Sequence, residues 1–276
     1  MNSKEQDRVE TPLLSVIIPV YNVQDVLPNA LHSVLCQGVE ALEIILINDG
    51  SQDNSLSVCQ AFAREDPRIQ VIDQQNAGPG AARNAGLKAA TGRYISFVDS
   101  DDTLEEGALQ ALLDAAQGQQ ADLVIAHFNI LMGDQCIDRG YIKADTVMDR
   151  PAFLHALARR PGSYYYSALW NKLYSRQLIE ERGLTFDHSY NWGEDFDFNM
   201  RYYHHVGLVS FVKKPVYNYR RTYAGQTWRT MFEVGDSFKI KSRLYRKLKG
   251  LYLHAGLYNK YRGHIYRYIF NVTLST

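Results

Sequence analysis

Acidic and amide side chains follow three apolar runs of this 276-residue sequence, and they are the groups best suited to chemistry. Asn22 follows the first run, Asp49 the second, and Asp99, Asp101 and Asp102 the third. Crowded carboxylates repel each other unless a cation or a donor-rich ligand lies between them. The hard oxygens of Asp99 and Asp101 favour Mg²⁺ or Mn²⁺, which often keep few protein ligands while bridging phosphates. The pattern therefore predicts a site for a divalent metal and a nucleoside diphosphate.

Structural explanations for the same residues remain open. Thr103 and Glu106 have the spacing of a capping box, so the acids before them could simply favour a helix N-terminus. Asp49 begins an Asp-Gly pair, which is common in turns. Capping does not, however, require Asp99 at the end of an apolar run together with Asp101. The acidic segment therefore stays a candidate ligand site.

A glycine-rich segment at residues 76–86 can also be interpreted in two ways. It could be only a helix start with small packing residues. Alternatively, its glycines, Gly78 among them, allow close backbone approach to a ligand, while Arg83 supplies a planar fork of donors.

The first half of the chain must position these groups, and it alternates apolar runs with amphipathic stretches. The runs are rich in Ile and Val and lack strict polar alternation, which is typical of buried strands in a parallel sheet. They cover residues 13–18, 42–47, 69–72, 94–98 and 122–126. Helices are expected between them at about 24–37, 54–66, 78–91 and 105–118. This alternation predicts an open α/β layer, and ligands of such layers bind at the carboxyl ends of the strands.

The second half is more aromatic and contains a second pair of candidate acids. A helix is expected to begin at Gly193 or Glu194, with Asp197 able to pair with Arg201 one turn later. Short strands are expected around 208–212 and 215–219. Glu194 and Asp195 could be catalytic, or they could be acids that favour a helix N-terminus.

The C-terminal segment is strongly basic. Residues 237–276 contain nine of the 30 Lys and Arg and no acid, which leaves 21 basic against 30 acidic residues before them. Residues 238–253 place Leu244, Leu248 and Leu251 at helical spacing. This segment could lie on an anionic membrane, or its leucines could pack on the rest of the protein; the two alternatives are weighed equally. No nucleic-acid motif accompanies the basic residues, so no nucleic acid is expected as a partner.

Several other classes of protein are excluded by composition. The sequence has neither a membrane-spanning apolar run nor a signal-peptide pattern. Cys36, Cys59 and Cys136 form no CxxC pair, so neither a disulfide framework nor a thiolate zinc site is expected. The sequence therefore predicts a cytoplasmic protein.

Six motifs in order carry a resemblance to a known family. They are SVIIPVYN (15–22), INDGSQD (47–53), NAGPGAARNAG (76–86), FVDSDD (97–102), WNKLYSR (170–176) and GEDFDF (193–198). From about residue 13 to residue 220 the chain resembles the bacterial family 2 glycosyltransferases. The resemblance implies an α/β fold of the GT-A type, with a Rossmann-like, open, mostly parallel sheet flanked by helices and a basic helical C-terminal segment. It implies a tail at 1–12, a catalytic domain at 13–228 divided into nucleotide-sugar (13–126) and acceptor (127–228) halves, and the basic segment at 229–276.

The same resemblance implies a role for each matching residue on the donor side. Asp49 would accept the uracil N–H, Asp99 would contact the ribose, and Asp101 would bind Mn²⁺ or Mg²⁺. The other expected donor-site residues are Pro19, Tyr21, Asn22, Gly78, Arg83 and Ser100.

On the acceptor side the resemblance implies a catalytic base and a binding segment. Asp195 resembles the base of inverting enzymes, and Glu194 would position the acceptor or the loop. An aspartate of ordinary pKa, about 3.9, is already ionised at neutral pH, so the base needs no unusual burial. Trp170, Asn171 and Lys172 would contact the acceptor, although core packing of Trp170 is an equally good explanation.

The resulting hypothesis is a metal-dependent, inverting hexosyl or N-acetylhexosaminyl transferase. It would move a sugar from a UDP-sugar to a glycan or lipid-linked glycan during synthesis of a bacterial capsule, O-antigen or lipopolysaccharide. The protein would contact the inner face of the cell membrane through residues 238–270. A catalytically silent nucleotide-binding or membrane scaffold is the main alternative. A nucleotidyltransferase is disfavoured because residues 19–25 are not a glycine-rich phosphate loop.

Overall fold

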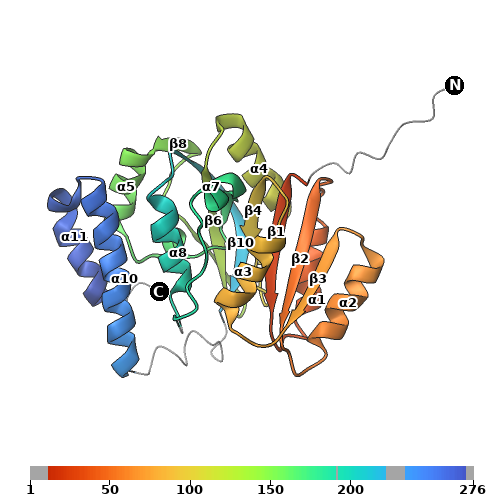
Figure 1. Cartoon of the computed structure of the whole chain (residues 1–276). Coiled ribbons are helices and arrows are strands. Elements are labelled where there is room, and N and C mark those ends of the chain that lie inside the picture. Colours follow the sequence, from red (N-terminus) through yellow and green to blue (C-terminus); the bar gives the residue numbers. More distant parts are fainter. Residues whose placement is uncertain (1–11, 191, 222–233, 272–276) are drawn as a thin grey trace.

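The computed structural model describes residues 12–190, 192–221 and 234–271. In this part of the chain ten strands form one sheet, whose main path is β3-β2-β1-β4-β9-β6-β10-β5. Helices flank the sheet, and α10 and α11 lie together at the opposite end of the molecule from β3 and α2 (Figure 1). The expected α/β fold is confirmed.

The first four strands of this path are parallel, and β1, β2 and β4 are buried as their composition predicts, whereas β3 at the edge of the sheet is partly exposed. The four strands are β1 (Leu14–Val20), β2 (Leu42–Asp49), β3 (Ile69–Gln74) and β4 (Tyr94–Phe97). β1 pairs with β2 and β4, and β2 pairs with β3, so the carboxyl ends of all four meet at one edge. The polar residues that follow the strands are therefore brought to that edge.

The helices between these strands also lie where the sequence predicts them. They are α1 (Leu27–Leu35), α2 (Ser55–Glu65), α3 (Pro79–Ala89) and α4 (Ala108–Gln119). α3 lies directly on the sheet, because a Cβ at Gly86 would come within 2.4 Å of Cγ2 of Ile17 and 3.0 Å of Cδ1 of Ile47. A glycine is therefore required at this contact, which holds Arg83 of the same helix against the ends of the strands.

The capping-box explanation of the acidic segment is wrong. Thr103 and Leu104 form the short strand β5 and pair with Asn218 and Tyr217. α4 begins only at Ala108, after Gly107, and has no side-chain cap. Pairing with a distant strand has overridden the local capping preference.

The second half of the chain completes the sheet with strands in both directions. β6 (Leu123–Met132) and β10 (Leu208–Arg220) pair in parallel, whereas β9 (Lys172–Ser175) is antiparallel to both β4 and β6. β7 (Gln135–Arg139) pairs with β6, and β8 (Thr146–Asp149) pairs with β10.

One sequence prediction differs from this arrangement. The two short strands expected at 208–212 and 215–219 are one strand, β10, with register shifts on either side of Pro215. Proline lacks an N–H, so it interrupts a ladder without ending the strand. The predicted division at residues 126 and 127 falls inside β6, while the predicted boundary at 228 and 229 lies outside the described residues.

The remaining helices surround the second half of the sheet. They are α5 (Arg150–Arg159), α6 (Tyr164–Ser167), α7 (Arg176–Glu181), α8 (Glu194–Tyr203), α10 (Val234–His254) and α11 (Tyr258–Asn271). α8 begins at Glu194 after Gly193, as predicted. The expected Asp197–Arg201 pair is also present, at 2.8 Å.

The leucine face of the basic segment packs on the protein. Leu244, Leu248 and Leu251 are at most 1% exposed, and α10 packs against α8 and α11. The alternative in which these leucines contact a membrane is therefore wrong, because their side chains are already buried against the rest of the protein. In the described part of the chain, no helix is both long and apolar enough to span a membrane.

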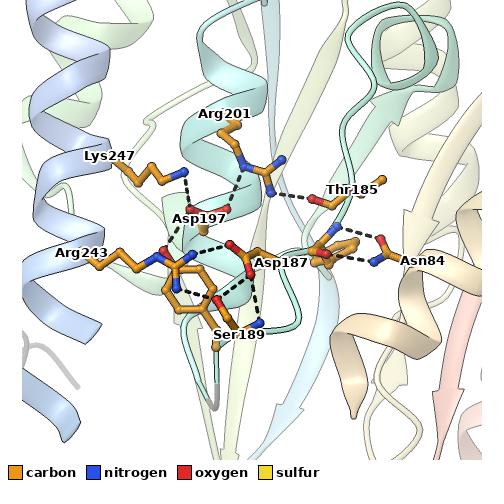
Figure 2. A network of polar contacts seen from close by, with 10 residues as sticks. Asn84, Thr185, Asp187, Ser189, Asp197, Arg201, Arg243 and Lys247 are labelled. Carbon is orange, nitrogen blue, oxygen red and sulfur yellow. Dashed lines mark hydrogen bonds and ion pairs between the residues drawn. The ribbon is translucent and has the colours of Figure 1, made fainter. Parts of the chain in front are cut away.

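Ion pairs add to this packing (Figure 2). Lys247 lies 3.2 Å from the buried carboxylate of Asp197 on α8. Arg243 donates hydrogen bonds to Asp187 and Ser189 and lies 4.1 Å from the ring centroid of Tyr190. Two cations of the basic segment thus form ion pairs with acids outside this segment, Asp187 and Asp197.

Candidate active site

A buried arginine brings together the acids of both halves of the chain. Nη2 of Arg83 lies 3.0 Å from Oδ1 of Asp99 at the end of β4. Nη1 lies 2.9 Å from Oε1 of Glu194 and 3.1 Å from Oδ1 of Asp195, both in the first turn of α8. The structure therefore places the predicted ribose contact and the predicted base on a single guanidinium.

This cluster has more negative than positive charge. Three carboxylates face one arginine, and the surrounding protein atoms hinder their hydration. Burial raises the pKa of Asp195 above the ordinary range; the charges of Glu194 and Asp99 raise it further, whereas Arg83 and Lys172 oppose the rise. This direction differs from the ordinary pKa expected for Asp195 from the sequence. As pH falls through this raised pKa, Asp195 loses the ionised form that a general base requires.

The acidic segment after β4 is fixed by the end of β10. Asp102 is 2% exposed, and its carboxylate accepts hydrogen bonds from the hydroxyl of Tyr217 (3.0 Å) and the backbone N–H of Arg220 (2.7 Å). Burial raises the pKa of Asp102 to about 8, and the charges of Asp101 and Asp99 add to the rise. Asp102 therefore has a structural role that its place in the DSDD motif did not reveal.

Asp101 differs from its neighbours in being exposed. Outside the four undescribed stretches (1–11, 191, 222–233 and 272–276), no group of three His, Cys, Asp or Glu side chains is placed to hold a metal ion. Asp101 could supply one ligand, and a diphosphate and water could supply the others, which is a common arrangement for Mg²⁺. The residues therefore fit a metal that is held jointly with a diphosphate.

Asp49 is buried among backbone donors. Its Oδ1 accepts hydrogen bonds from Nε2 of Gln74 (2.7 Å) and N of Ala77 (3.0 Å), and its Oδ2 accepts one from N of Gly78 (2.8 Å). Gly50 has φ +69°, and a Cβ there would lie 2.7 Å from N of Asn76. The Asp-Gly pair therefore forms a turn that holds residues 74–78. A uracil N–H would therefore have to donate its hydrogen bond to Oδ2, which accepts one fewer bond than Oδ1.

The loops after β1 and β2 hold each other through Asn22. Its N–H donates to Oγ of Ser51 at 3.2 Å, and its side-chain oxygen accepts from N of Gln52 at 2.7 Å. Tyr21 beside it is 40% exposed. Tyr21 is therefore free to stack on a base.

The other predicted donor contacts differ in exposure. Pro19 and Gly78 are half-buried, whereas Ser100 is buried. The donor-site assignments of these three residues stay predictions.

The segment at 170–172 is not positioned to contact an acceptor. Asn171 and Lys172 are both 0% exposed. Nζ of Lys172 donates to the carbonyl oxygens of Tyr165 and Ala168 and to Oδ1 of Asn171. Burial lowers the pKa of Lys172 well below its usual range, and Asp195 opposes the shift. Direct contact of Asn171 or Lys172 with an acceptor does not agree with this arrangement.

Trp170 is a packing residue, the alternative left open by the sequence. It is 5% exposed and stacks on Tyr217 and Tyr219, with ring centroids 4.5 and 5.7 Å apart. Through Tyr217 it supports the acidic segment. Tyr217 was missed by sequence reasoning because only the pairing of β10 with β5 places it there.

A second missed residue, Asn84, joins α3 to the segment before α8. Its side chain donates to the carbonyl oxygen of Phe186 (2.9 Å) and accepts from the N–H of Phe186 (2.7 Å) (Figure 2). Phe186 in turn lies under the guanidinium of Arg83, 5.7 Å from its ring centroid. A lone amide in a helix of small residues, next to Arg83, was the available signal.

Comparison with known proteins points to one family. The family model described as glycosyl transferase family 2 matches residues 15–183. EpsJ of Bacillus subtilis, an uncharacterized glycosyltransferase, is 35% identical over 213 residues, which are 76% of this chain and 61% of EpsJ. The succinoglycan biosynthesis protein ExoO of Rhizobium meliloti is 30% identical over 71% of this chain and 56% of its own length. The chain thus spans less than two thirds of the length of each of these relatives.

The fold has a solved counterpart. The crystal structure of S. aureus TarS 1–349 superposes with a TM-score of 0.74 at 22% identity, covering 95% of this chain and 72% of that one. TarS 1–349 has also been solved in complex with UDP and with UDP-GlcNAc. At this identity the likeness establishes the fold alone.

Proposed function

The chain belongs to glycosyl transferase family 2, and from this premise we propose that it transfers a sugar from a UDP-sugar to a hydroxyl of a glycan or lipid-linked glycan. The observation that carries the proposal is the convergence of Asp99, Glu194 and Asp195 on Arg83. The acids come from opposite halves of the chain, and a group-transfer site needs donor and acceptor groups side by side. The UDP complexes of TarS support uridine as the nucleotide.

In the proposed reaction, Asp195 accepts the proton of the acceptor hydroxyl as that oxygen attacks the anomeric carbon. The bond from the anomeric carbon to the diphosphate breaks, and UDP leaves. A single displacement by one base facing the leaving group gives inversion. Asp99 holds the ribose, and Asp101 would hold Mn²⁺ or Mg²⁺, which when bound stabilises the charge that develops on the diphosphate.

The transferred sugar is a hexose or an N-acetylhexosamine in this proposal, and the product is a bacterial surface polysaccharide. The name of ExoO, a succinoglycan biosynthesis protein, supports polysaccharide synthesis as the pathway class. A cytoplasmic location is also proposed, supported by the free cysteines Cys36, Cys59 and Cys136.

A peripheral membrane contact is a further part of the proposal, in a form that differs from the sequence expectation. The leucines of α10 are buried, so the contact would be made by the outer surface of α10 and α11. Arg246, Arg262 and Arg267 are exposed there, with Leu253 54% and Tyr266 48% exposed. Each basic residue near an anionic surface contributes about 1 kcal/mol. Sedimentation with phosphatidylglycerol vesicles but not with phosphatidylcholine vesicles is expected, and equal sedimentation with both would contradict it.

The donor assignment is tested by thermal unfolding with UDP, GDP, CDP, dTDP or ADP, each with Mn²⁺, Mg²⁺ or EDTA. A ligand at 100 times its Kd stabilises a protein by about 2.7 kcal/mol. We expect stabilisation by UDP with a divalent metal. Stabilisation by another nucleotide alone would overturn the choice of uridine. No stabilisation by any nucleotide would favour the alternative of a catalytically silent scaffold.

A further inference from the structure

Arg83 lies behind the acids that it binds. Its side chain is 7% exposed, whereas those of Glu194, Asp195 and Asp99 are 14%, 26% and 32% exposed. A ligand that reaches this cluster therefore meets the carboxylates first. Nη2 of Arg83 donates a hydrogen bond to Asp99 and Nη1 donates one to Glu194, while Asp195 is an ion-pair partner 3.1 Å from Nη1.

We propose that Arg83 is a positioning residue that ties the ribose-binding acid to the catalytic base, instead of a direct donor contact. The proposal rests on the proposed function for the roles of Asp99 and Asp195. Only a planar guanidinium presents two donor edges at fixed separation, so a lysine in the same place cannot hold both acids. The buried ring of Phe186 below Arg83 and the hydrogen bonds of Asn84 to residue 186 support the guanidinium in this position.

The arrangement has a consequence for the protonation of the base. The titratable groups facing Asp195 are Arg83 on α3, Glu194 on α8, Asp99 after β4 and Lys172 on β9. Arg83 favours the ionised base, and Glu194 competes with Asp195 for the same Nη1. Weakening the arginine contact should therefore make the base harder to ionise, whereas removing the charge of Glu194 should make ionisation easier.

Two variants test these opposite effects. Arg83→Lys keeps the charge but loses the fork, and Glu194→Gln removes the competing charge with little change of shape. Arg64→Lys, at an exposed position of α2, is the matched control. The measurements are UDP affinity with Mn²⁺, by calorimetry, and the rate of UDP-glucose or UDP-GlcNAc hydrolysis without acceptor as a function of pH.

For Arg83→Lys we expect UDP affinity within about threefold of the parent, a rate lowered at least tenfold, and an acid limb of the pH profile that moves to higher pH, because the weaker contact favours the ionised base less. For Glu194→Gln we expect the acid limb to move to lower pH. The control should change neither quantity.

A loss of UDP affinity of about 100-fold or more in Arg83→Lys, with the acid limb unmoved, would make Arg83 a direct donor contact and overturn the proposal. Acid limbs that move in the same direction in both variants would also overturn it. If the parent hydrolyses neither UDP-sugar, the proposed donor fails. UDP affinity then still decides the role of Arg83, with retained affinity supporting positioning.

Discussion

The hydroxyl of Tyr217 donates a hydrogen bond to Oδ2 of Asp102 at 3.0 Å, across 115 positions of sequence. The same hydroxyl accepts a hydrogen bond from the backbone N–H of Asp99 at 3.1 Å. One phenol of β10 therefore fixes both ends of the four-residue acidic segment. The exposed Asp101 between them is held in place without making a side-chain bond of its own to Tyr217.

Tyr217→Phe should destabilise the protein by about 1 to 3 kcal/mol, because the N–H of Asp99 loses its hydroxyl acceptor and the buried carboxylate of Asp102 loses one of its two donors. Urea unfolding measures the change. Tyr141→Phe is the control, since Tyr141 is 41% exposed. If the two variants unfold at the same urea concentration, the hydroxyl of Tyr217 is not holding the segment.

Asp101→Ala should remove the part of UDP binding that depends on Mn²⁺ while leaving the fold intact, because this carboxylate is exposed. The measurement is UDP affinity with Mn²⁺ and with EDTA. Asp134→Ala removes another exposed carboxylate, on the β6–β7 turn, and should leave both affinities unchanged. An unchanged dependence on Mn²⁺ in Asp101→Ala would remove this residue from the metal site.

Asp195→Asn should lower turnover by roughly 10² to 10⁴, the usual effect of losing a general base. Donor binding should persist, because the amide has nearly the same shape and the donor contacts lie on Asp99 and its neighbours. Steady-state rates and UDP affinity are measured together. Asp114→Asn, at an exposed position on α4, serves as control, and near-normal turnover in Asp195→Asn would assign the base elsewhere.

Lys247→Met should destabilise the protein by about 1 to 3 kcal/mol, in the range for a buried group that loses a partner. The carboxylate of Asp197 is 1% exposed and would keep only Arg201 (2.8 Å) and the hydroxyl of Tyr190 (3.1 Å) as partners. Arg246→Met changes an exposed cation one residue away and should have little effect. Equal midpoints of thermal unfolding for the two variants would show that the Lys247–Asp197 ion pair does not stabilise the protein.

The first half of the fold could be predicted because β1, β2 and β4 are buried on both faces and the helices lie between the strands in sequence. β1 to β4 and α1 to α4 are local features, and composition alone marks them. The sequence motifs predicted Arg83, Asp99 and Asp195 as site residues, and the structure brings these three side chains together, while their roles stay predictions.

The remainder depends on contacts between distant residues. Thr103 has a good local sequence for a helix cap, yet it pairs with Asn218 in a strand. The motif predicts that Lys172 is a ligand-binding cation. In the structure its Nζ is buried and donates hydrogen bonds to three acceptors in the core. The leucine stripe of α10 predicts an apolar partner. The same spacing of leucines is expected whether that partner is a lipid surface or the helix α8. No local pattern distinguishes these cases.

The position of β9 determines the order in which the sheet can be completed. Residues 172–175 lie between β4, which ends at residue 97, and β6, which ends at residue 132. During synthesis on the ribosome, β4 and β6 are made before β9. Until β9 is made, the backbone groups that pair with it stay unpaired on both strands, and such strand edges are templates for aggregation. The pairing of Tyr94 with Ser175 is also a non-local contact of the kind that slows folding. The nascent chain therefore passes through a stage at which the facing edges of β4 and β6 are both open and exposed to aggregation.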